Sequence, residues 1–234
     1  MSRLIKTEGF VIRIVPFQDH DLILTLFTAA LGKVAAFAKG ARRPRSRFGP
    51  EIDLLSRSEF ILLDSKNIKP LREASLKRYF HALKENYDHL NSALHATRLL
   101  SRLVPEDQQD IPNLRLFSLF LQALDQKKVH LDLYELAFKL RLLDNFGTGP
   151  HLDNCIRCEK PLSPGWFSLE RGGMVCKQCR TRSDVSLAAP VVQSLIALRT
   201  MKWETLERVK LNAKEISDGN QILDRFLAYH VQDR

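Results

Sequence analysis

The chain has 234 residues, a formal net charge of +9 at pH 7 and a sequence pI of about 9.5. That length suits one large domain or two to three small ones. The longest apolar run is too short to cross a bilayer, and the first residues lack the apolar core of a signal peptide. Residues 1–80 hold fifteen Lys/Arg against eight Asp/Glu. We therefore expect a cytoplasmic protein that makes no membrane contact and whose N-terminal part meets an acidic partner such as nucleic acid.

Residues 1–80 show short runs of alternating apolar and polar residues, a pattern typical of strands. The runs cover residues 4–15, 22–28, 32–39, 58–63 and 68–74. Pro16 is expected to end the first strand, and the following Asp19-His20-Asp21 is expected to be a polar turn rather than a catalytic cluster. Five strands without a helix between them predict a small closed barrel. An OB-fold is the nucleic-acid-binding barrel of this size, although the pattern does not separate it from an SH3-like barrel.

The third strand, with Val34, Ala36 and Ala38 on one face, leads into a loop rich in cations. Pro44 and Gly49 disfavour a helix in this loop. A cationic loop on a β-scaffold suits the sugar-phosphate backbone of nucleic acid, and Phe37 and Phe48 are close to it in sequence. The alternative is a solvated loop that only aids solubility. The candidate nucleic-acid-binding residues fall within fifteen positions that hold no acid: Lys33, Lys39, Arg42, Arg43, Arg45 and Arg47.

After residue 80 the apolar spacing changes to three and four, which indicates helices. We expect helices at residues 80–104, 112–126, 131–146, 190–203 and 216–231. Pro105 stops the first of them and Gly147 follows the third. The second is apolar almost all round and should be the buried centre of a bundle. The apolar faces of the helices should form the core, including Tyr87, Phe117 and Phe138.

A metal motif follows, with the spacing Cys-x2-Cys-x17-Cys-x2-Cys. Its candidate ligands are Cys155, Cys158, Cys176 and Cys179. Four sulfurs make a closed tetrahedral site, which suits one zinc ion in a structural role. Residues 166–175 fit a hairpin that brings the two cysteine pairs together. A redox dithiol pair is disfavoured, and His151 is expected to be a loop histidine rather than a ligand.

Three stretches together resemble the RecO family of bacterial recombination mediators and DNA repair proteins, and the resemblance spans nearly the whole chain. They are residues 32–43, residues 138–152 and the segment that joins Phe167-Ser168, Gly172-Gly173 and the second cysteine pair. The chain departs from the family at residues 51–55, where a Gln-Pro-Phe-like segment is usual. No contact of a basic C-terminal tail is carried over, because the sequence stops soon after His230.

The resemblance implies a DNA-binding protein of the bacterial nucleoid rather than an enzyme. It implies binding of single-stranded and double-stranded DNA and annealing of complementary strands. With RecR, such a protein helps load RecA on DNA coated by single-stranded-DNA-binding protein. No Walker loop, nucleophile elbow or zinc-protease helix is present in the sequence. A zinc-ribbon module for RNA binding or transcription, and a hydrolase with an unrecognised site, remain alternatives.

The resemblance also implies contact with the acidic, apolar-ended C-terminal tail of single-stranded-DNA-binding protein. Such a tail needs a cation and an apolar pocket side by side. The helical region contains both kinds of residue in its sequence. An equally weighted alternative is that these apolar residues belong to the core and that the cations are only solvated. The cations are Arg98, Arg102, Lys127, Lys128, Lys139 and Arg141, and the apolar residues are Leu99, Leu103, Phe117, Phe120 and Phe138.

The expected architecture is α+β and multidomain: an N-terminal OB-like β-barrel, a helical bundle and a zinc module with four cysteine ligands. The barrel is expected at residues 1–79 and the helical domain at residues 80–150. The zinc module should cover residues 151–182. Residues 183–234 should form C-terminal helices that pack back on the helical domain.

Overall fold

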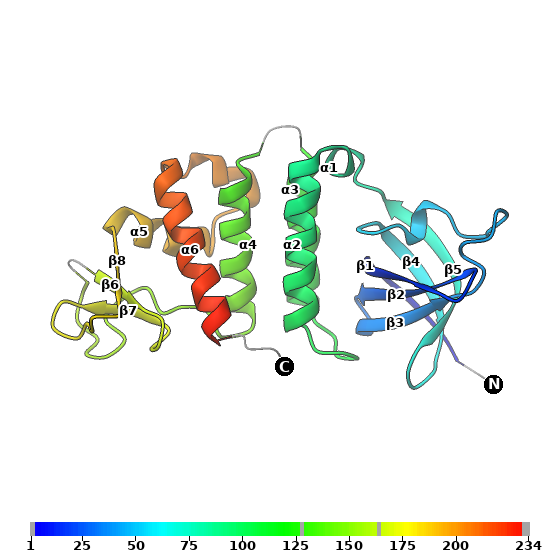
Figure 1. Ribbon diagram of the computed structural model, residues 1–234, viewed down its shortest axis with the longest axis horizontal. Coiled ribbons are helices and arrows are strands. Elements are labelled where there is room, and N and C mark those ends of the chain that lie inside the picture. The colour runs from blue at the N-terminus through cyan, green and yellow to red at the C-terminus, as the bar shows by residue number, and fades with distance from the viewer. Residues whose placement is uncertain (1–2, 127–128, 163–164, 231–234) are drawn as a thin grey trace. The chain divides into compact units, whose positions relative to one another are not determined.

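The computed structural model describes residues 3–126, 129–162 and 165–230 (Figure 1). The chain forms two compact units, residues 1–121 and residues 122–234. The border between them falls inside helix α3 (Ile111–Leu124), within the region expected as one helical domain. The expected domain borders therefore stay predictions, and each unit is described by itself.

The first unit contains a closed five-stranded barrel. Its strands are β1 (Leu4–Phe17), β2 (Asp21–Thr28), β3 (Gly32–Ala38), β4 (Arg57–Leu63) and β5 (Lys69–Arg78). They close in the order β1-β2-β3-β5-β4, with all neighbours antiparallel except the parallel pair β3–β5. The expected barrel is confirmed, and this strand order is that of the OB-fold.

Apolar side chains at alternate positions of the strands fill the barrel interior. Val34, Ala36 and Ala38 are all buried, as their shared face predicted. Successive side chains of a strand point to opposite faces, so one face of β3 enters the core and the other faces outward. Other strands contribute large apolar side chains to the same core, among them Val11, Leu24, Leu26, Phe60 and Leu62.

Strand β1 runs past Pro16, so the prediction that Pro16 ends it was wrong. Strand β4 pairs only with residues Leu4–Phe10 of β1, and the rest of β1 pairs with β2 alone. Proline is tolerated where a strand has a free edge, because its missing N–H is not needed there. The extension carries Phe17 to the end of the strand, opposite Asp21.

Three helices of the first unit follow the barrel: α1 (His81–Glu85), α2 (Tyr87–Leu103) and α3. The single helix expected at residues 80–104 is broken at Asn86. The Asn86 side chain accepts hydrogen bonds from the backbone N–H groups of Asp88 and His89, and so caps α2. The break leaves Tyr87 79% exposed, which corrects its prediction as core. Phe117 is fully buried, as expected.

Polar and aromatic contacts hold α2 and α3 against the barrel within this unit. The Lys33 amine donates to the carbonyl of Ser101 (2.7 Å), and the backbone N–H of Asp107 donates to the Lys33 carbonyl (3.0 Å). The Phe10 ring packs edge-on against Phe117, with centroids 5.2 Å apart. A one-turn 3₁₀ helix, η1 (Pro50–Ile52), precedes β4. These helices thus contact the barrel directly through hydrogen bonds at Lys33 and through the Phe10–Phe117 ring contact.

The second unit combines helices with a small sheet. Helix α4 (Leu131–Asn145) packs against α5 (Ala189–Leu198) and α6 (Ala213–His230), and a 3₁₀ helix η2 (Trp203–Arg208) lies beside α4. The sheet has the order β7-β6-β8, formed by β6 (Gly165–Ser168), β7 (Gly173–Cys176) and β8 (Val185–Leu187). The expected hairpin is β6–β7, whereas β8 was not expected. Val231, predicted as the end of the last helix, lies outside the described residues.

The small sheet is joined to helix α6. The Phe167 ring lies edge-on to Phe226, with centroids 6.1 Å apart. The His230 ring donates to the carbonyl of Leu169 (2.7 Å) and packs on Phe226. The cysteine-bearing module is therefore fixed to the helices of its own unit.

One lysine is partly enclosed where the barrel of the first unit meets α1. The Lys84 amine donates to the Ser56 hydroxyl (3.0 Å) and lies 3.5 Å from the centre of the Tyr79 ring. The Tyr79 hydroxyl in turn donates to Asp53 (3.0 Å). Burial lowers the pKa of Lys84 from its ordinary value of 10.5 to about 8, and the charge of Asp53 opposes this shift.

We predict that stability depends on pH through Lys84. The folded state binds the Lys84 proton less tightly than the unfolded state, so the free energy of unfolding should rise as the pH increases from about 8 towards 10.5. Lys84→Met keeps the apolar stem without the charge and should flatten this rise. Urea unfolding followed by circular dichroism at several pH values measures it. Lys66→Met, on an exposed turn, should keep the wild-type slope; a wild-type slope in Lys84→Met would contradict the prediction.

Candidate nucleic-acid interface and candidate metal centre

The cationic loop leaves β3 at Lys39, and its first turn is held by the turn between β1 and β2. The backbone N–H of Gly40 donates to the Asp21 carboxylate (2.6 Å). The backbone N–H of Arg42 donates to the carbonyl of His20 (2.9 Å). The polar turn at residues 19–21 therefore fixes the position of the loop without engaging its cationic side chains.

The far end of the loop is held by the barrel. The Arg47 guanidinium donates to the carbonyl of Leu71 (3.1 Å) and lies 4.8 Å from the centre of the Phe48 ring. Phe48 is only 8% exposed and belongs to the barrel core. Phe48 thus holds the loop from inside, and its ring is not presented to a nucleic acid.

The six candidate cations fall into three groups. Lys33 is the second residue of β3, and its amine donates to the Ser101 carbonyl. It lies about 20 Å from Lys39, because a strand rises about 3.3 Å per residue. Arg47 uses part of its guanidinium to hold the loop. The remaining four are exposed, and within the described residues none of them forms an ion pair: Lys39, Arg42, Arg43 and Arg45.

Two aromatic rings lie on the outer face of the barrel next to this loop. Phe17 ends β1 and is 40% exposed, and Phe37 of β3 is half-buried. Their rings meet edge-to-face with centroids 5.9 Å apart. Ile23 of β2 lies opposite Phe37 in the sheet and extends the apolar surface. The sequence prediction missed Phe17 because it ended β1 too early; the alternation Arg13, Val15, Phe17 was the signal for a longer strand.

Rings and cations side by side offer two kinds of contact. Exposed aromatic rings stack with bases of a single strand, and Lys and Arg attract its phosphates. The register places Phe17 opposite Asp21, which also holds Gly40 of the loop, so both features share one region of the barrel. The arrangement suits a flexible, negatively charged strand better than a compact anion.

The four cysteines predicted as metal ligands come together at one point. Their sulfur atoms all lie within 4.8 Å of one another, and Cys158 and Cys176 are 3.7 Å apart. Zinc–sulfur bonds of about 2.3 Å place the sulfurs of a tetrahedron about 3.8 Å apart, so the set has the right size for one such ion. The β6–β7 hairpin produces this meeting, because Cys176 ends β7.

Backbone amides around the cysteines favour thiolates. Burial by itself would raise the pKa of Cys155, but amides of Cys176, Cys158 and Arg157 outweigh it and lower that pKa to about 6. Burial and the neighbouring sulfurs raise the pKa of Cys179 to about 12. The four sulfurs therefore do not all ionise together unless a cation offsets their mutual repulsion. This donor set fits a divalent ion that prefers sulfur.

Two sequence models, for the N-terminal and C-terminal parts of one protein family, together match nearly all of the chain. "Recombination protein O N terminal" matches residues 1–80 and "Recombination protein O C terminal" matches residues 84–234. A DNA repair protein RecO from Alkaliphilus metalliredigens is 31% identical, over 97% of this chain and 94% of the relative. That from Desulfatibacillum aliphaticivorans is 31% identical, over 97% and 92%.

The chain belongs to the RecO family of DNA repair proteins. The resemblance carried by the basic loop and the cysteine module is thereby confirmed. The N-terminal family match ends at residue 80, close to the end of β5, and the C-terminal match covers the cysteine module. Within the described residues, none of the helices has the length and apolar character needed to cross a membrane.

In this RecO-family chain, five of the eleven residues considered for an acidic tail have internal roles. Lys139 pairs with Asp224 (2.6 Å), and the Arg141 guanidinium donates to the carbonyl of Leu198 (2.7 Å). Two of the cations, Lys127 and Lys128, lie outside the described residues. Three of the aromatic rings are buried core residues: Phe117, Phe120 and Phe138.

His151 lies outside the cysteine cluster. Its ring is 2.5 Å from the amide oxygen of Asn154, and its backbone pairs with the strand that carries Cys176. The backbone N–H of His151 donates to Gly172 (3.0 Å) and its carbonyl accepts from Met174 (2.8 Å). Its backbone therefore helps to position the module, whereas its side chain is no part of the sulfur set.

We predict that Cys158→Ser releases the metal and lowers the melting temperature. Removing one of four ligands opens the tetrahedron, and metal-binding free energy at such a site is also folding free energy. Elemental analysis of protein purified without chelator, together with thermal unfolding, measures both effects. His151→Gln is the matched control and should keep the metal. Metal-free wild-type protein, or full metal content in Cys158→Ser, would refute the assignment.

Proposed function

We propose that this RecO-family chain is a non-enzymatic DNA-binding recombination mediator that binds single-stranded and double-stranded DNA and anneals complementary strands. The observation that supports it is the group of four exposed cations on a loop that is held at both ends. Fixed cations lower the entropy lost on binding, and each phosphate contact releases a counterion. The exposed Phe17 ring and the half-buried Phe37 ring add a contact for unpaired bases.

Annealing is compatible with this kind of contact. Phosphate contacts position a strand without reading its sequence, so the base edges stay available for a complementary strand. Neutralising phosphates also reduces the repulsion between two strands that approach each other. The proposed surface would therefore bring strands together without selecting among sequences.

The proposed partners follow from membership of the family. With RecR, the protein helps load RecA on single-stranded DNA that is coated by single-stranded-DNA-binding protein, so its effect on RecA is indirect. It acts in the bacterial cytoplasm, at the nucleoid. Contact with the acidic tail of single-stranded-DNA-binding protein belongs to the same proposal.

We also propose that the ion held by the four cysteines is zinc and that its role is structural. Four thiolates leave no open coordination position for a water, so the site supplies no chemistry. The sheet that carries Cys176 has three short strands, and an ion would link its hairpin to the turn at Cys155–Cys158. The ion would thereby stabilise a module that is too small to hold its shape by apolar burial alone.

The cationic loop is tested by a fourfold replacement, Lys39, Arg42, Arg43 and Arg45 each to Gln. The slope of log K against log salt should flatten by about 0.7–0.9 for each phosphate contact removed, for every DNA sequence alike. Fluorescence anisotropy with labelled oligonucleotides at several salt concentrations measures this. Arg47 is left unchanged because it holds the loop.

The matched control changes four exposed cations of the other unit by the same charge: Lys202, Arg208, Lys210 and Lys214 to Gln. The control should keep the wild-type slope. If the salt slope flattened equally in both variants, the loop would contribute only through the overall charge of the protein. An unchanged slope in the loop variant would mean that DNA binds at another surface. A clear preference for RNA over matched DNA would favour the RNA-binding alternative.

Phe17→Ala is predicted to weaken binding of single-stranded DNA by about 1–3 kcal/mol while leaving the salt slope unchanged, because stacking involves no counterion. Duplex DNA should be affected much less, since its bases are already stacked. Tyr87→Ala, at an exposed ring of α2, is the control and should bind both forms normally. Equal weakening for both DNA forms would argue against stacking at Phe17.

A further inference from the structure

Solvent reaches the four cysteines of the second unit to different degrees. Cys155 is fully buried, whereas Cys158, Cys176 and Cys179 are partly exposed. A zinc ion at this site would activate no water, but the thiolates that bind such an ion are themselves nucleophiles. Three of the ligand residues are therefore open to a small reactive solute, although the site has a structural role.

Cys158 and Cys176 bring the two cysteine turns into contact. Cys158 belongs to the first turn, residues 155–158, and Cys176 ends β7 and opens the second turn, residues 176–179. Their sulfur atoms are 3.7 Å apart. A disulfide bond is about 2.05 Å long, so the two sulfurs need to approach by only about 1.7 Å to form one. Such a bond would join the same two segments that a zinc ion joins.

Backbone hydrogen bonds hold the first cysteine turn beside β7 without using the sulfur atoms. The N–H of Ile156 donates to the carbonyl of Met174 on β7 (2.9 Å), and the N–H of Met174 donates to the carbonyl of His151 (2.8 Å). Met174 is two residues before Cys176 on the same strand. The backbone therefore keeps the two turns side by side in addition to any ion that the sulfurs bind.

Cations flank both of these cysteines in the chain. Arg157 precedes Cys158 and Lys177 follows Cys176; both cations are exposed, and neither forms an ion pair among the described residues. A nearby cation stabilises a thiolate and makes it more reactive. Glu159, directly after Cys158, opposes this effect at the first turn. Cys176 is therefore the better placed of the two to react first, with Cys158 beside it to resolve the product.

We propose that Cys176 and Cys158 form a reversible oxidation site for hydroperoxides. The Cys176 thiolate attacks the outer oxygen of the peroxide, the O–O bond breaks, and the other oxygen leaves with the electron pair and takes up a proton, as an alcohol or water. The Cys158 thiolate then attacks the resulting sulfenic acid, whose hydroxyl group takes up a second proton and leaves as water. The two sulfurs lose two electrons in total, and the peroxide gains them.

Oxidation of this pair empties the metal site but keeps the module together. Only Cys155 and Cys179 remain as thiolates, and two ligands do not complete a tetrahedron. The new disulfide links the two turns in place of the ion, while the packing of Phe167 on Phe226 lies outside the reaction. A thiol reductant and zinc return the chain to its first state. This inference rests on the proposed structural zinc and adds a chemical signal that removes it.

The test exposes the full zinc-loaded chain to excess hydrogen peroxide in the presence of a chromogenic zinc chelator. One zinc ion per chain should be released, whereas the chain without peroxide should keep its zinc. The count of free thiols should fall from four to two, and peptide mapping without reduction should find the disulfide between Cys158 and Cys176. Far-ultraviolet circular dichroism should stay unchanged, because the disulfide keeps the module joined. Dithiothreitol with added zinc should restore the metal content.

Lys177→Gln tests the electrostatic step without removing a ligand. This variant should keep its zinc, and peroxide should release that zinc about two- to fivefold more slowly at low salt, the size of an exposed charge interaction. The difference should shrink at high salt. Lys210→Gln makes the same charge change at an exposed residue outside the module and should match the wild-type rate. An unchanged rate in Lys177→Gln would overturn the assignment of Cys176 as the attacking sulfur.

Two further outcomes would overturn the inference as a whole. The first is zinc-loaded protein that keeps its zinc in excess peroxide, which would leave the proposed structural zinc intact. The second is a disulfide mapped within one turn, Cys155 to Cys158 or Cys176 to Cys179. Protein that carries no zinc before oxidation would instead contradict the proposed zinc itself, and this inference with it.

Discussion

The bond between the Asp21 carboxylate and the backbone N–H of Gly40 determines how the proposed DNA surface is presented. Several cations on one short loop repel each other, so the loop would spread unless something other than those charges held it. Asp21 and His20 hold its beginning through backbone groups, and Leu71 with buried Phe48 holds its end. The exposed cations are thereby kept together and still free to meet phosphates.

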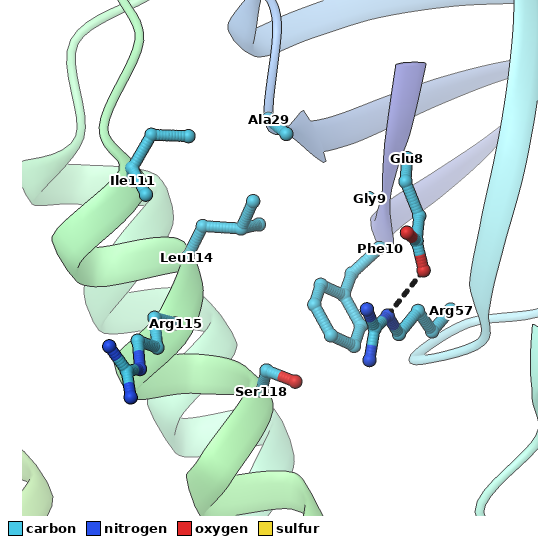
Figure 2. Close-up of a pocket in the computed structure, with 9 residues that line it drawn as sticks. All are labelled: Glu8, Gly9, Phe10, Ala29, Arg57, Ile111, Leu114, Arg115 and Ser118. Carbon is cyan, nitrogen blue, oxygen red and sulfur yellow. Dashed lines mark ion pairs between the residues drawn. The ribbon is translucent and has the colours of Figure 1, made fainter.

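The two ends of the barrel differ in chemical character, one being cationic and the other largely apolar. One end joins the cationic loop to the outer rings of Phe17 and Phe37, and so favours a polyanion with unpaired bases. The other end is covered by α3 and offers an apolar hollow of small net charge between β1 and Ile111 (Figure 2). Gly32, at this end of β3, has a positive φ of 68°, and a Cβ there would lie 1.8 Å from the Gln108 carbonyl oxygen. A larger residue would force the barrel and the segment before α3 apart, so this close approach requires glycine.

The cysteine module is a very small sheet, and contacts with α6 explain how such a sheet is held in its unit. Its sheet has three strands of only three or four residues, so few side chains are available for a core of its own. Two contacts attach it to α6: the Phe167 ring packs against Phe226, and the His230 ring donates a hydrogen bond to the carbonyl of Leu169. A metal ion bound by the four sulfurs would link segments that are about twenty residues apart in the chain. The module thus stays attached to its own unit rather than forming a separate core.

The local sequence pattern was enough to predict the five-stranded barrel, the inward-facing side of β3, the basic loop and the proximity of the two Cys-x2-Cys pairs. These features depend on spacing between near neighbours, which sequence displays directly. Only the tertiary structure decided which cations are free, because the partner of Lys33 is 68 residues away and that of Arg47 is 24 residues away. It also decided that Phe48 is buried, that Phe17 faces outward and that Arg57, Phe10 and Ile111 line one hollow. Such outcomes depend on which distant segments pack together, and periodicity along a single segment carries no information about them.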